Sequence, residues 1–509
     1  MTPGDLKADH NLSRTDWLVL IALFVAAAAF QLSNPTNGDT SWLLTVGEKI
    51  LSGDQLYKDV IETNPPMSVF IYLPSVVAQA ISGVSADVFQ VFYMLILIAG
   101  SLLLVGSIML TSGATDGMPR FLTMSAFVLT IIPVYTFSER EHIAVTLILP
   151  ALVLLATRAD RCPQRVGQGV LAGLAMGLAL CLKPQFAVAI LLPNLYVAGR
   201  LRSLRPLFAI ENLATAVVVM AYGVFVILHY PLYLQVILPM LQETYRSVRL
   251  PIYLMLLSPQ FISVFGAGVA TASLMPRHRS LSFILALAGF GFLFAFFEQG
   301  KGWPYHLFPA IAIFFILFLT HGMPRFVASL EGRERRSPLP LAAGAIAIIC
   351  FASLFPFLKA RNISSLPLAA RIEAIVPHPK ILAISYELSI GHPLTRMVGG
   401  TWVGTVCSEW LSETASLIAD LPTTSPERKE RLRGWIEHDR DTMAHDLRVG
   451  QPDVVLVDRK TYPWDDLMAS GSEAATLLKN YRLVDRAGDI ELLARADLAA
   501  RFPVDQPVR

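Results

Sequence analysis

Four polar stretches interrupt the apolar part of this 509-residue chain, and each holds residue types that could do chemistry. A positioned carboxylate can take a proton from an attacking hydroxyl group. Fixed cations can stabilise the negative charge on a departing phosphate. The carboxylates, cations and aromatic side chains of these stretches therefore suit a transfer reaction that expels a phosphate. The stretches are residues 34–64, 138–142, 183–185 and 298–306.

In the first stretch, Asp39 follows an Asn-Gly pair. Such a pair favours a turn, which could direct the carboxylate towards a membrane surface. Residues 42–50 have helical spacing with one apolar face, which predicts a helix that lies on the membrane. Asp39 could instead be an ordinary acid of a solvated loop, an interpretation that fits Glu48 and Asp54 better.

The second stretch reads SEREH and places four ionisable residues in a row where an apolar segment begins. Ionisable groups near hydrocarbon usually face a cavity or one another, although a hydrated helix end would also carry them. Glu139 and Glu141 are two residues apart and cannot share one helix face. We expect Glu141 to be the acid that points into a site, and Arg140 and His142 to be substrate-binding residues there.

The third and fourth stretches supply lysines at chain breaks. Lys183 stands between an apolar segment and a proline, and Lys301 lies between two glycines that leave room for an anion. Trp303 and His306 follow Lys301 closely. A lysine that only anchors a helix end and an aromatic belt at the membrane interface are the alternatives. The belt accounts for Trp303 but not for Lys301 or His306.

The elements that must position these residues are mostly membrane helices. Hydrophobic residues make up 54% of the chain and charged residues 16%, with mean hydropathy +0.53, whereas a soluble protein has about 25% charged residues. The net charge of +2 gives no reason to expect nucleic acid as a partner. Charges become ordinary only after residue 358. We predict a polytopic α-helical membrane domain over residues 1–358 and a soluble α/β domain over residues 359–509.

The distribution of arginine sets the predicted orientation. Arginines concentrate in loops at residues 158–165, 200–205, 277–279 and 325–336, and the loops between them are poorer in cations. Loops rich in arginine stay in the cytoplasm, and Lys7 and Arg14 place the N-terminus there too. Residues 17–33 are interpreted as a retained first helix, without a cleavable signal peptide. The four polar stretches then gather on the extracytoplasmic side.

This orientation requires one apolar run not to cross the membrane. Residues 67–81 are the best choice, because the run is short, follows two prolines and contains Pro74. About eleven spans remain. The chain would then lie in a bacterial plasma membrane, with a cytoplasmic N-terminus, a periplasmic first loop over residues 34–87 and a periplasmic C-terminal domain. If the run formed a twelfth span, every arginine-rich loop would lie outside.

The C-terminal domain has the pattern of a small α/β fold. Apolar runs at 380–385 and 453–458 predict buried strands, residues 481–493 predict a hairpin, and residues 410–420 and 426–447 predict helices. Asp458 at a strand end is a weak candidate for a site and is more often structural. We expect this domain to shape access of an acceptor. The four cysteines have no paired spacing, so we predict no disulfide.

Several motifs together resemble the membrane glycosyltransferases of the GT-C superfamily: the first-loop acid, GDQLYKD and ETNPPM in the same loop, SEREH, and QGKGWPYH. The resemblance is strongest to bacterial members related to family 39, which include protein O-mannosyltransferases and the aminoarabinose transferase that modifies lipid A. It covers the membrane region, roughly residues 17–358. It implies an inverting enzyme that moves a sugar from a polyprenyl-phosphate donor to an extracytoplasmic acceptor in the cell envelope.

The resemblance also implies roles for individual residues. Asp39 matches the first-loop acid, a catalytic base or an acid close to a metal, and Glu141 lies in the loop of the second acid, although SEREH is not the usual form of that loop. The family often has an acid pair after the first helix. Here Thr40 follows Asp39, so the sequence leaves open whether a divalent cation binds, and no cofactor is assigned. On this hypothesis Lys183, Lys301, Arg140 and His306 hold the phosphate, and Tyr57 and Trp303 lie near the lipid or the sugar.

Two other functions fit parts of the pattern. One is a polymerase or ligase of surface polysaccharides that uses a diphosphate carrier. The other is a transporter or flippase, which predicts charged residues near the middle of helices and repeats in the two halves of the chain. Here the charges cluster at one end of the apolar segments, with Glu211 as the exception, and no such repeat is found.

The orientation can be tested by labelling cysteines with a membrane-impermeant reagent. We predict that cysteines introduced at Arg161 and Arg202 are protected in intact spheroplasts, and that cysteines at Gly38 and Gln299 are labelled, because the arginine-rich loops stay inside. Cys407 is a natural reporter for the C-terminal domain. Protection of Cys407 in intact spheroplasts, with labelling only after denaturation, would count against this orientation.

Overall fold

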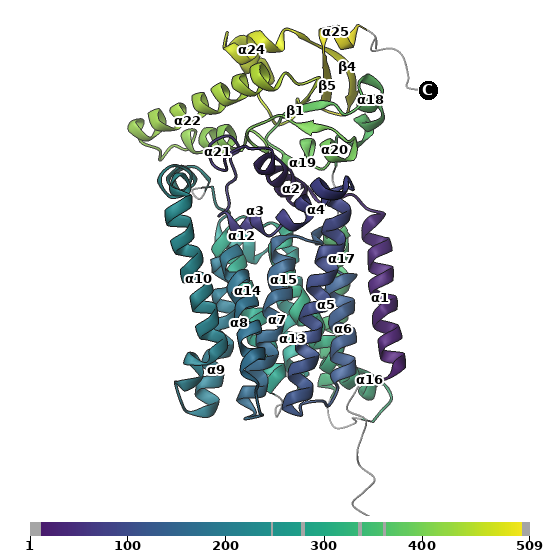
Figure 1. The fold of residues 1–509 in the computed structure, drawn as a ribbon. Coiled ribbons are helices and arrows are strands. Elements are labelled where there is room, and N and C mark those ends of the chain that lie inside the picture. Colours follow the sequence, from purple (N-terminus) through teal and green to yellow (C-terminus); the bar gives the residue numbers. More distant parts are fainter. Residues whose placement is uncertain (1–11, 246–247, 276–279, 334–337, 360–362, 501–509) are drawn as a thin grey trace, which may run out of the picture. The chain divides into compact units, whose positions relative to one another are not determined.

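The computed structural model describes residues 12–245, 248–275, 280–333, 338–359 and 363–500. Lys7 and the loop arginines at 277, 279, 335 and 336 lie outside the described residues. The chain divides into two compact units, and Figure 1 labels their elements. The first unit comprises Met1–Asn34, Val88–Phe225 and Leu250–Ala360, and the second comprises Pro35–Asp87, Val226–Arg249 and Arg361–Arg509.

The first unit is a helix bundle. In the described part of the chain, seven helical stretches are long and apolar enough to cross a membrane, which identifies a multi-pass membrane protein. The total of eleven spans stays a prediction. The seven stretches are α1 (Arg14–Leu32), α5 (Ala86–Ser112), α7 (Arg140–Ala159), α10 (Ile210–His229), α14 (Ser280–Gln299), α17 (Leu339–Lys359) and the run Pro304–Leu330, which contains η6 (Pro304–Leu307), α15 (Phe308–Leu317), η7 (Phe318–Gly322) and α16 (Met323–Leu330).

Shorter helices complete this bundle. They are α6 (Met118–Thr130), η1 (Val134–Thr136), α8 (Val166–Leu182), η2 (Pro184–Phe186), α9 (Ala187–Leu201), η3 (Arg205–Phe208), α12 (Ile252–Leu256) and α13 (Pro259–Ser273).

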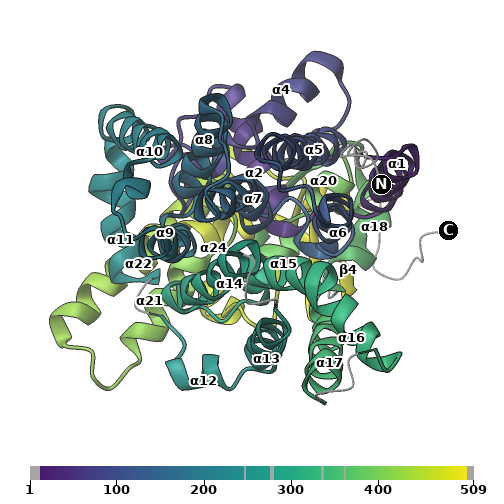
Figure 2. The same cartoon turned by 90° about the horizontal axis from the view of Figure 1, so that it is seen from below.

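Helix α7 lies at the centre of the bundle, as the view along the helices shows (Figure 2). Helices α8, α9, α14 and α15 pack against it, and all of its residues except Arg158 are buried. Helices α1 and α10 instead expose most of their apolar side chains, as lipid-facing helices do. Because α7 begins at Arg140, its central position carries the SEREH segment into the interior of the unit.

Helices α8 and α10 approach each other closely along a row of glycines. A Cβ atom added to Gly169 or Gly173 would lie 2.3 Å from Ile210 Cγ2 or from the backbone oxygen of Glu211, respectively. Small residues at four-residue spacing permit this kind of helix contact in membranes. The same region contains an ion pair in which Arg158 donates two hydrogen bonds to Glu211, at 2.9 and 2.8 Å. Glu211, the exception in the charge pattern, is therefore neutralised within the bundle.

The second unit gathers the first loop around a mixed sheet. From the first loop and residues 226–249 it takes α2 (Gly38–Leu51), α3 (Met67–Phe70), α4 (Leu73–Ser82), η4 (Tyr233–Ile237) and α11 (Leu238–Glu243). Residues 67–81 fall in α3, with four residues, and in α4, with ten; α4 alone rises about 15 Å, half of a bilayer core. That this run does not cross the membrane stays a prediction. The remaining helices are η8 (Leu366–Leu368), α18 (Ala369–Ile375), α19 (Leu388–Gly391), α20 (Leu394–Met397), α21 (Trp410–Ala419), α22 (Pro426–His445), η9 (Asp446–Gly450), α23 (Trp464–Ala469), α24 (Glu473–Leu478) and α25 (Ala496–Ala499).

The sheet has five strands in the order β2-β1-β3-β5-β4. Strand β1 pairs in parallel with β2 and β3, and β5 pairs antiparallel with β3 and β4. The two predicted strands, the hairpin and both helices of this region are confirmed. Asp458 accepts hydrogen bonds from Ser385 and Thr461, a structural role. The strands are β1 (Lys380–Ile384), β2 (Thr401–Trp402), β3 (Val454–Asp458), β4 (Tyr481–Ala487) and β5 (Ile490–Arg495).

Arg396 ties the first loop to the segment that follows β1. Its buried guanidinium donates to Glu48 Oε2 at 2.7 Å and to Asp87 Oδ2 at 2.9 Å. The two carboxylates raise the pKa of Arg396 against the opposing effect of burial. The expectation that Glu48 is merely solvated is therefore wrong, because its carboxylate neutralises a buried cation. Asp54 is partly exposed, with Lys49 Nζ at 3.5 Å from its carboxylate.

The apolar face of α2 packs inside the second unit. The ring of His392 contacts both Trp42 and Trp402, at 5.3 and 4.5 Å between ring centroids. Burial lowers the pKa of His392 to about 3, so the imidazole is neutral. The predicted helix over residues 42–50 is confirmed, but α4 and α19 cover its apolar face. The amphipathic pattern thus reflects packing against protein.

All four cysteines are free thiols. Cys407 is only partly exposed, and burial, followed by the negative charge of Glu62, raises the pKa of its thiol. Thiols react as thiolates, so Cys407 will be labelled slowly even where the reagent has access. A cysteine introduced at an exposed position of α22, such as Glu430, is a better reporter of this domain.

Glu409 and Asp439 form a buried pair of acids beside the sheet. The two side chains are 3% and 2% exposed and share a hydrogen bond. Asp439 also accepts from the backbone N–H of Ser412 at 3.0 Å. Burial, and then the nearby charge of Asp439, raises the pKa of Glu409 well above its usual value. Glu409 is therefore the acid that keeps its proton, and its O–H group donates the hydrogen bond to Asp439.

This pair predicts a pH dependence of stability. In the unfolded chain Glu409 ionises near pH 4.3, whereas in the folded chain it stays protonated to higher pH. The stability that protonated Glu409 gives to the folded state is complete below the pKa of the unfolded chain. It is lost as pH rises through the folded pKa, at up to about 1.4 kcal/mol per pH unit. We expect Glu409→Gln, whose amide can donate the same hydrogen bond, to gain stability relative to the wild type between pH 5 and pH 8.

Thermal unfolding of purified protein in detergent at several pH values measures this difference. Glu430→Gln is the matched control, because Glu430 lies exposed on α22 beside Arg433. A Glu409→Gln profile parallel to that of the wild type would show that Glu409 is ionised in the folded protein.

Candidate functional site

Three helix ends bring the predicted polar stretches of the first unit together. Glu139 precedes the first residue of α7, Lys183 follows the last residue of α8, and Gln299 is the last residue of α14. The chain after Gln299 continues through η6, which contains His306. Because α7, α8 and α14 pack side by side, stretches that are far apart in sequence meet at one end of the bundle.

Lys183 is the centre of this polar cluster. Its ammonium group donates hydrogen bonds to Glu141 Oε1 and to Gln299 Oε1, the latter at 2.8 Å. His306 Nε2 lies 3.6 Å from the same Glu141 oxygen. Glu141, Lys183 and His306 are 0%, 6% and 4% exposed. Buried charges are stable only when they are paired and hydrogen bonded, so these residues form one interdependent group.

The cluster keeps unused hydrogen-bonding capacity. Within the described part of the chain, Glu141 Oε2 and His306 Nδ1 are buried and have no hydrogen-bond partner. A buried polar atom without a partner usually costs about 1–3 kcal/mol, and in a native structure such an atom calls for an explanation, such as a bound water or ion or a functional role. The geometry therefore has the properties of a binding site as well as those of a structural ion pair.

Aromatic rings border the cluster on one side. Lys183 Nζ lies 5.8 Å from the centroid of the Tyr305 ring, within the range of a cation–π contact. Tyr305 also contacts the ring of His306, and Trp303 stacks on Tyr305 at 5.7 Å. Trp303 is 41% exposed. These rings connect the buried charges with an exposed aromatic surface.

The remaining predicted cations lie close by in different surroundings. Arg140 is buried and acts electrostatically on Lys183 and His306, and Lys301 acts on His306. His142 Nδ1 accepts a hydrogen bond from the backbone N–H of Ser138 at 3.2 Å. Its ring packs between Phe137 and Phe308. These contacts hold His142 in the first turn of α7, and its predicted role in substrate binding stays a prediction.

The backbone conformation explains why glycines stand on both sides of Lys301. Gly300 and Gly302 have φ values of 69° and 70°, a left-handed region that disfavours other residues. The backbone oxygen of Gly300 accepts a hydrogen bond from the backbone N–H of Leu250 at 2.9 Å. A Cβ atom on Gly302 would lie 2.5 Å from Leu250 Cδ1. The turn that carries Lys301 thus depends on glycine whether or not an anion binds there.

Asp39 and Tyr57 belong to the second unit. Asp39 lies in the first turn of α2, where Asn37 caps the helix by accepting from the backbone N–H of Thr40 at 2.7 Å. Its side chain is partly exposed, and no hydrogen bond or ion pair joins it to another residue in the described ranges. Tyr57 is buried, donates to the backbone oxygen of Asn64 at 2.7 Å and contacts Tyr233.

Sequence reasoning did not select Gln299, which the structure places on Lys183. An amide beside Gly300 in a dense polar run was the available signal. It also missed Glu62, whose buried carboxylate accepts from the Trp42 indole at 2.5 Å. In the described part of the chain, no group of three or more His, Cys, Asp or Glu residues is arranged to hold a metal ion.

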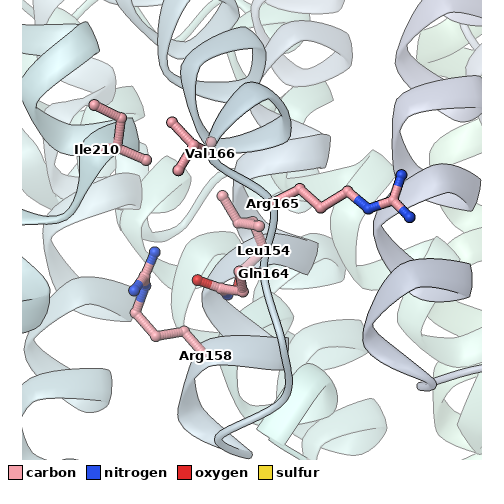
Figure 3. A pocket seen from close by; sticks show the side chains of 7 residues that line it. Leu154, Arg158, Gln164, Arg165, Val166 and Ile210 are labelled. Carbon is pink, nitrogen blue, oxygen red and sulfur yellow. The ribbon is translucent and has the colours of Figure 1, made fainter.

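A separate pocket of about 200 Å³ lies where α7 ends and α8 begins, at the other end of the bundle. Figure 3 shows Arg158, Gln164 and Ile210 around it, while the side chain of Arg165 extends away from the other labelled residues. Arg158 is held by Glu211. None of the residues predicted for the site lines this pocket, so we assign it to helix packing.

The Lys183–Glu141 contact predicts a coupling that stability measurements can detect. Removing one partner of a buried ion pair commonly costs about 3–5 kcal/mol, because the other charge is left uncompensated. We expect Lys183→Met to lower the thermal stability of the purified protein strongly, and the double variant with Glu141→Gln to recover most of the loss. Lys301→Met, in a partly exposed turn, is the control. If the losses of the single variants simply add in the double variant, the two residues do not form the coupled pair.

Comparison with known proteins addresses the fold. No protein-family model matches the chain, and no curated protein sequence matches it. The structure of ArnT from Cupriavidus metallidurans bound to undecaprenyl phosphate aligns with a TM-score of 0.54 and 14% identity, covering 96% of this chain and 99% of that chain. The apo structure of the same ArnT aligns with a TM-score of 0.51 and 14% identity, covering 95% of this chain and 99% of that chain. The structure of AglB from Archaeoglobus fulgidus aligns with a TM-score of 0.43 and 10% identity, covering 97% of this chain and 75% of that chain.

ArnT is a membrane glycosyltransferase of the GT-C superfamily. The alignment with ArnT extends over almost the whole of both chains, whereas the low identity limits the likeness to the fold. The resemblance to GT-C proteins expected from the first loop, SEREH and QGKGWPYH is confirmed at this level. The chain is a multi-pass membrane protein with the fold of the GT-C glycosyltransferases.

Proposed function

We propose that this protein is an inverting glycosyltransferase that moves a sugar from a polyprenyl-phosphate donor to an extracytoplasmic acceptor. The observation that carries the proposal is the buried cluster of Glu141, Lys183, Gln299 and His306 at one end of a bundle with the GT-C fold. A transporter predicts charged residues near the middle of helices, whereas the charges of this cluster lie at helix ends. A donor with an apolar chain, a phosphate and a sugar can use the ammonium group of Lys183 and the exposed ring of Trp303.

Lys183 is the residue best placed to hold the donor phosphate. Its position is maintained by Glu141 and Gln299, while Arg140 and Lys301 add positive charge around His306. Charge-assisted hydrogen bonds from such groups stabilise phosphate oxygens. Trp303 offers an exposed ring to the isoprenoid chain or the sugar. ArnT with this fold has been solved with undecaprenyl phosphate bound, which supports the choice of donor class.

Asp39 is our candidate for the base. In the reaction an acceptor hydroxyl oxygen forms a bond to the anomeric carbon, and the bond from that carbon to the phosphate oxygen breaks. The hydroxyl proton goes to Asp39, and polyprenyl phosphate leaves with the bonding electrons. A base needs a carboxylate that is not committed to other protein groups. Asp39 meets this requirement, whereas Glu141 is engaged by Lys183, which favours a positioning role for Glu141.

The proposed orientation follows the loop arginines. It places the N-terminus in the cytoplasm of a bacterial plasma membrane, and the first loop and residues 361–509 in the periplasm. The acceptor, a lipid, glycan or protein, would then be reached on the periplasmic side. Arg396 and its carboxylate partners hold the first loop against the segment after β1, which gives residues 361–509 a means to shape access of the acceptor.

The test is mass spectrometry of envelope lipids and glycans from a deletion strain complemented with variants. We expect the deletion strain to lack one hexose, pentose or uronic acid substituent. Asp39→Asn should insert and accumulate normally without restoring the substituent, since a general base commonly contributes about 10²–10⁴-fold to rate. Asp54→Asn, at a partly exposed acid of the same loop, is the matched control and should restore it.

Other outcomes identify which part of the proposal fails. Full activity of Asp39→Asn with an inactive Glu141→Gln would move the base to the second loop. Full activity of both variants, or an unchanged glycan profile in the deletion strain, would contradict the glycosyltransferase proposal and favour a transporter. The double variant Glu141→Gln, Lys183→Met should be stable but inactive. If it is as active as the wild type, the buried pair serves the fold alone.

A further inference from the structure

A second pocket lies in the first unit at the end of the bundle opposite the Lys183 cluster. It is surrounded by the end of α5, the start of α6, the end of α7, the start of α14 and the η7–α16 turn. The Lys183 cluster instead lies at the start of α7 and the ends of α8 and α14. The pocket has a volume of about 480 Å³, within the range of small-molecule sites. Its residues take no part in the function proposed above.

The lining combines both signs of charge with apolar walls. Arg120 and Arg325 supply guanidinium groups, and Asp116 and Asp160 supply carboxylates. Arg325 is fixed by a hydrogen bond of 2.9 Å to the backbone oxygen of Leu274. Arg120 is exposed and makes no hydrogen bond or ion pair within the ranges that the structure describes. The apolar walls come from Met109, Phe121, Val153 and Leu281.

A local distortion of the helix contributes to this lining. The run between α15 and α16 is a π-helical turn, Phe318–Gly322. Such turns are rare and often occur at functional sites. This turn brings Thr320 and His321 to the pocket, joined by a hydrogen bond of 2.9 Å. It also introduces α16, which places Arg325 at the same opening.

The surroundings favour a lipid over a soluble ligand. Helix α16 has no buried residue, and it exposes the apolar side chains of Val327 and Leu330 at 40% and 60%. A helix with an exposed apolar face beside a basic residue is typical of the boundary between headgroups and acyl chains. Basic pockets at the ends of membrane helices commonly bind lipid headgroups.

We propose that this pocket binds a phospholipid whose headgroup carries both a phosphate and a primary ammonium. The guanidinium groups of Arg120 and Arg325 hold the phosphate by charge-assisted hydrogen bonds. The carboxylate of Asp160, which already accepts from Ser280 Oγ at 2.5 Å, has further lone pairs for the ammonium N–H groups. The apolar walls take the first part of the acyl chains. This inference is independent of the proposed enzymatic function.

The experiment is native mass spectrometry of the full-length protein exchanged into nanodiscs that contain phosphatidylethanolamine, phosphatidylglycerol or phosphatidylcholine with matched acyl chains. We expect phosphatidylethanolamine to be retained about tenfold more than phosphatidylcholine, whose ammonium has no N–H to donate, a difference of about 1.4 kcal/mol. Phosphatidylglycerol, with the phosphate alone, should be intermediate.

Variants separate the two halves of the headgroup. Arg120→Gln should weaken retention of phosphatidylethanolamine and phosphatidylglycerol equally, and it should fold normally because Arg120 is exposed without a protein partner. Asp160→Asn keeps an acceptor for Ser280 and should abolish only the preference for phosphatidylethanolamine over phosphatidylglycerol. Arg200→Gln is the matched control, since Arg200 is exposed at the same end of the bundle, on α9, and lines no part of this pocket.

Three results would overturn the proposal. Equal retention of all three lipids would mean nonspecific lipid contact. Tighter retention of phosphatidylglycerol than of phosphatidylethanolamine would remove the role of the carboxylates. Competition by the soluble headgroup glycerophosphoethanolamine at the same concentration as the lipid would identify a soluble ligand in place of a membrane lipid.

Discussion

The pairing of Lys183 with Glu141 is the interaction on which the first unit depends most. A cation and a carboxylate buried at the end of a membrane bundle each need the other, because either one alone would have to give up its hydration without compensation. The pair can form only if α7 lies at the centre and the end of α8 reaches its first turn. Gln299 at the end of α14 also contacts Lys183, and His306 in η6 also contacts Glu141. The buried ion pair therefore helps to position α7, α8, α14 and η6.

The second unit has a corresponding constraint in Arg396. Glu48 lies 348 residues before it and Asp87 309 residues before it, so the ion pairs close very long loops. They hold α2 and the start of α5 against the segment that follows β1, while His392 fills the space between Trp42 and Trp402. Helix α2, whose first turn carries Asp39, is therefore held by the ion pair of Glu48 near its end and by the ring contact of Trp42.

Local sequence patterns predicted much of this structure, but they did not predict which residues pair over long distances in the sequence. The strands at β1 and β3, the β4–β5 hairpin and the helices α21 and α22 follow from apolar periodicity and turn residues within short windows. SEREH, Lys183 and His306 were recognisable because ionisable residues are rare in apolar segments. Gln299 had only a weaker signal, its place in a dense polar run beside Gly300, since a neutral amide has no such penalty. The role of Glu48 depends on Arg396, and nothing in the local sequence shows that partner.

Asp39 and Glu141 are both acids in polar stretches, but they differ in burial and in their partners. A fully buried charge must be paired with a fixed partner, and a paired carboxylate is already engaged by protein groups. Glu141 has this environment, with Lys183 and His306. Asp39 instead lies partly exposed in the first turn of α2. The proposal that Glu141 orients cations and that Asp39 accepts the proton rests on this difference in burial and pairing.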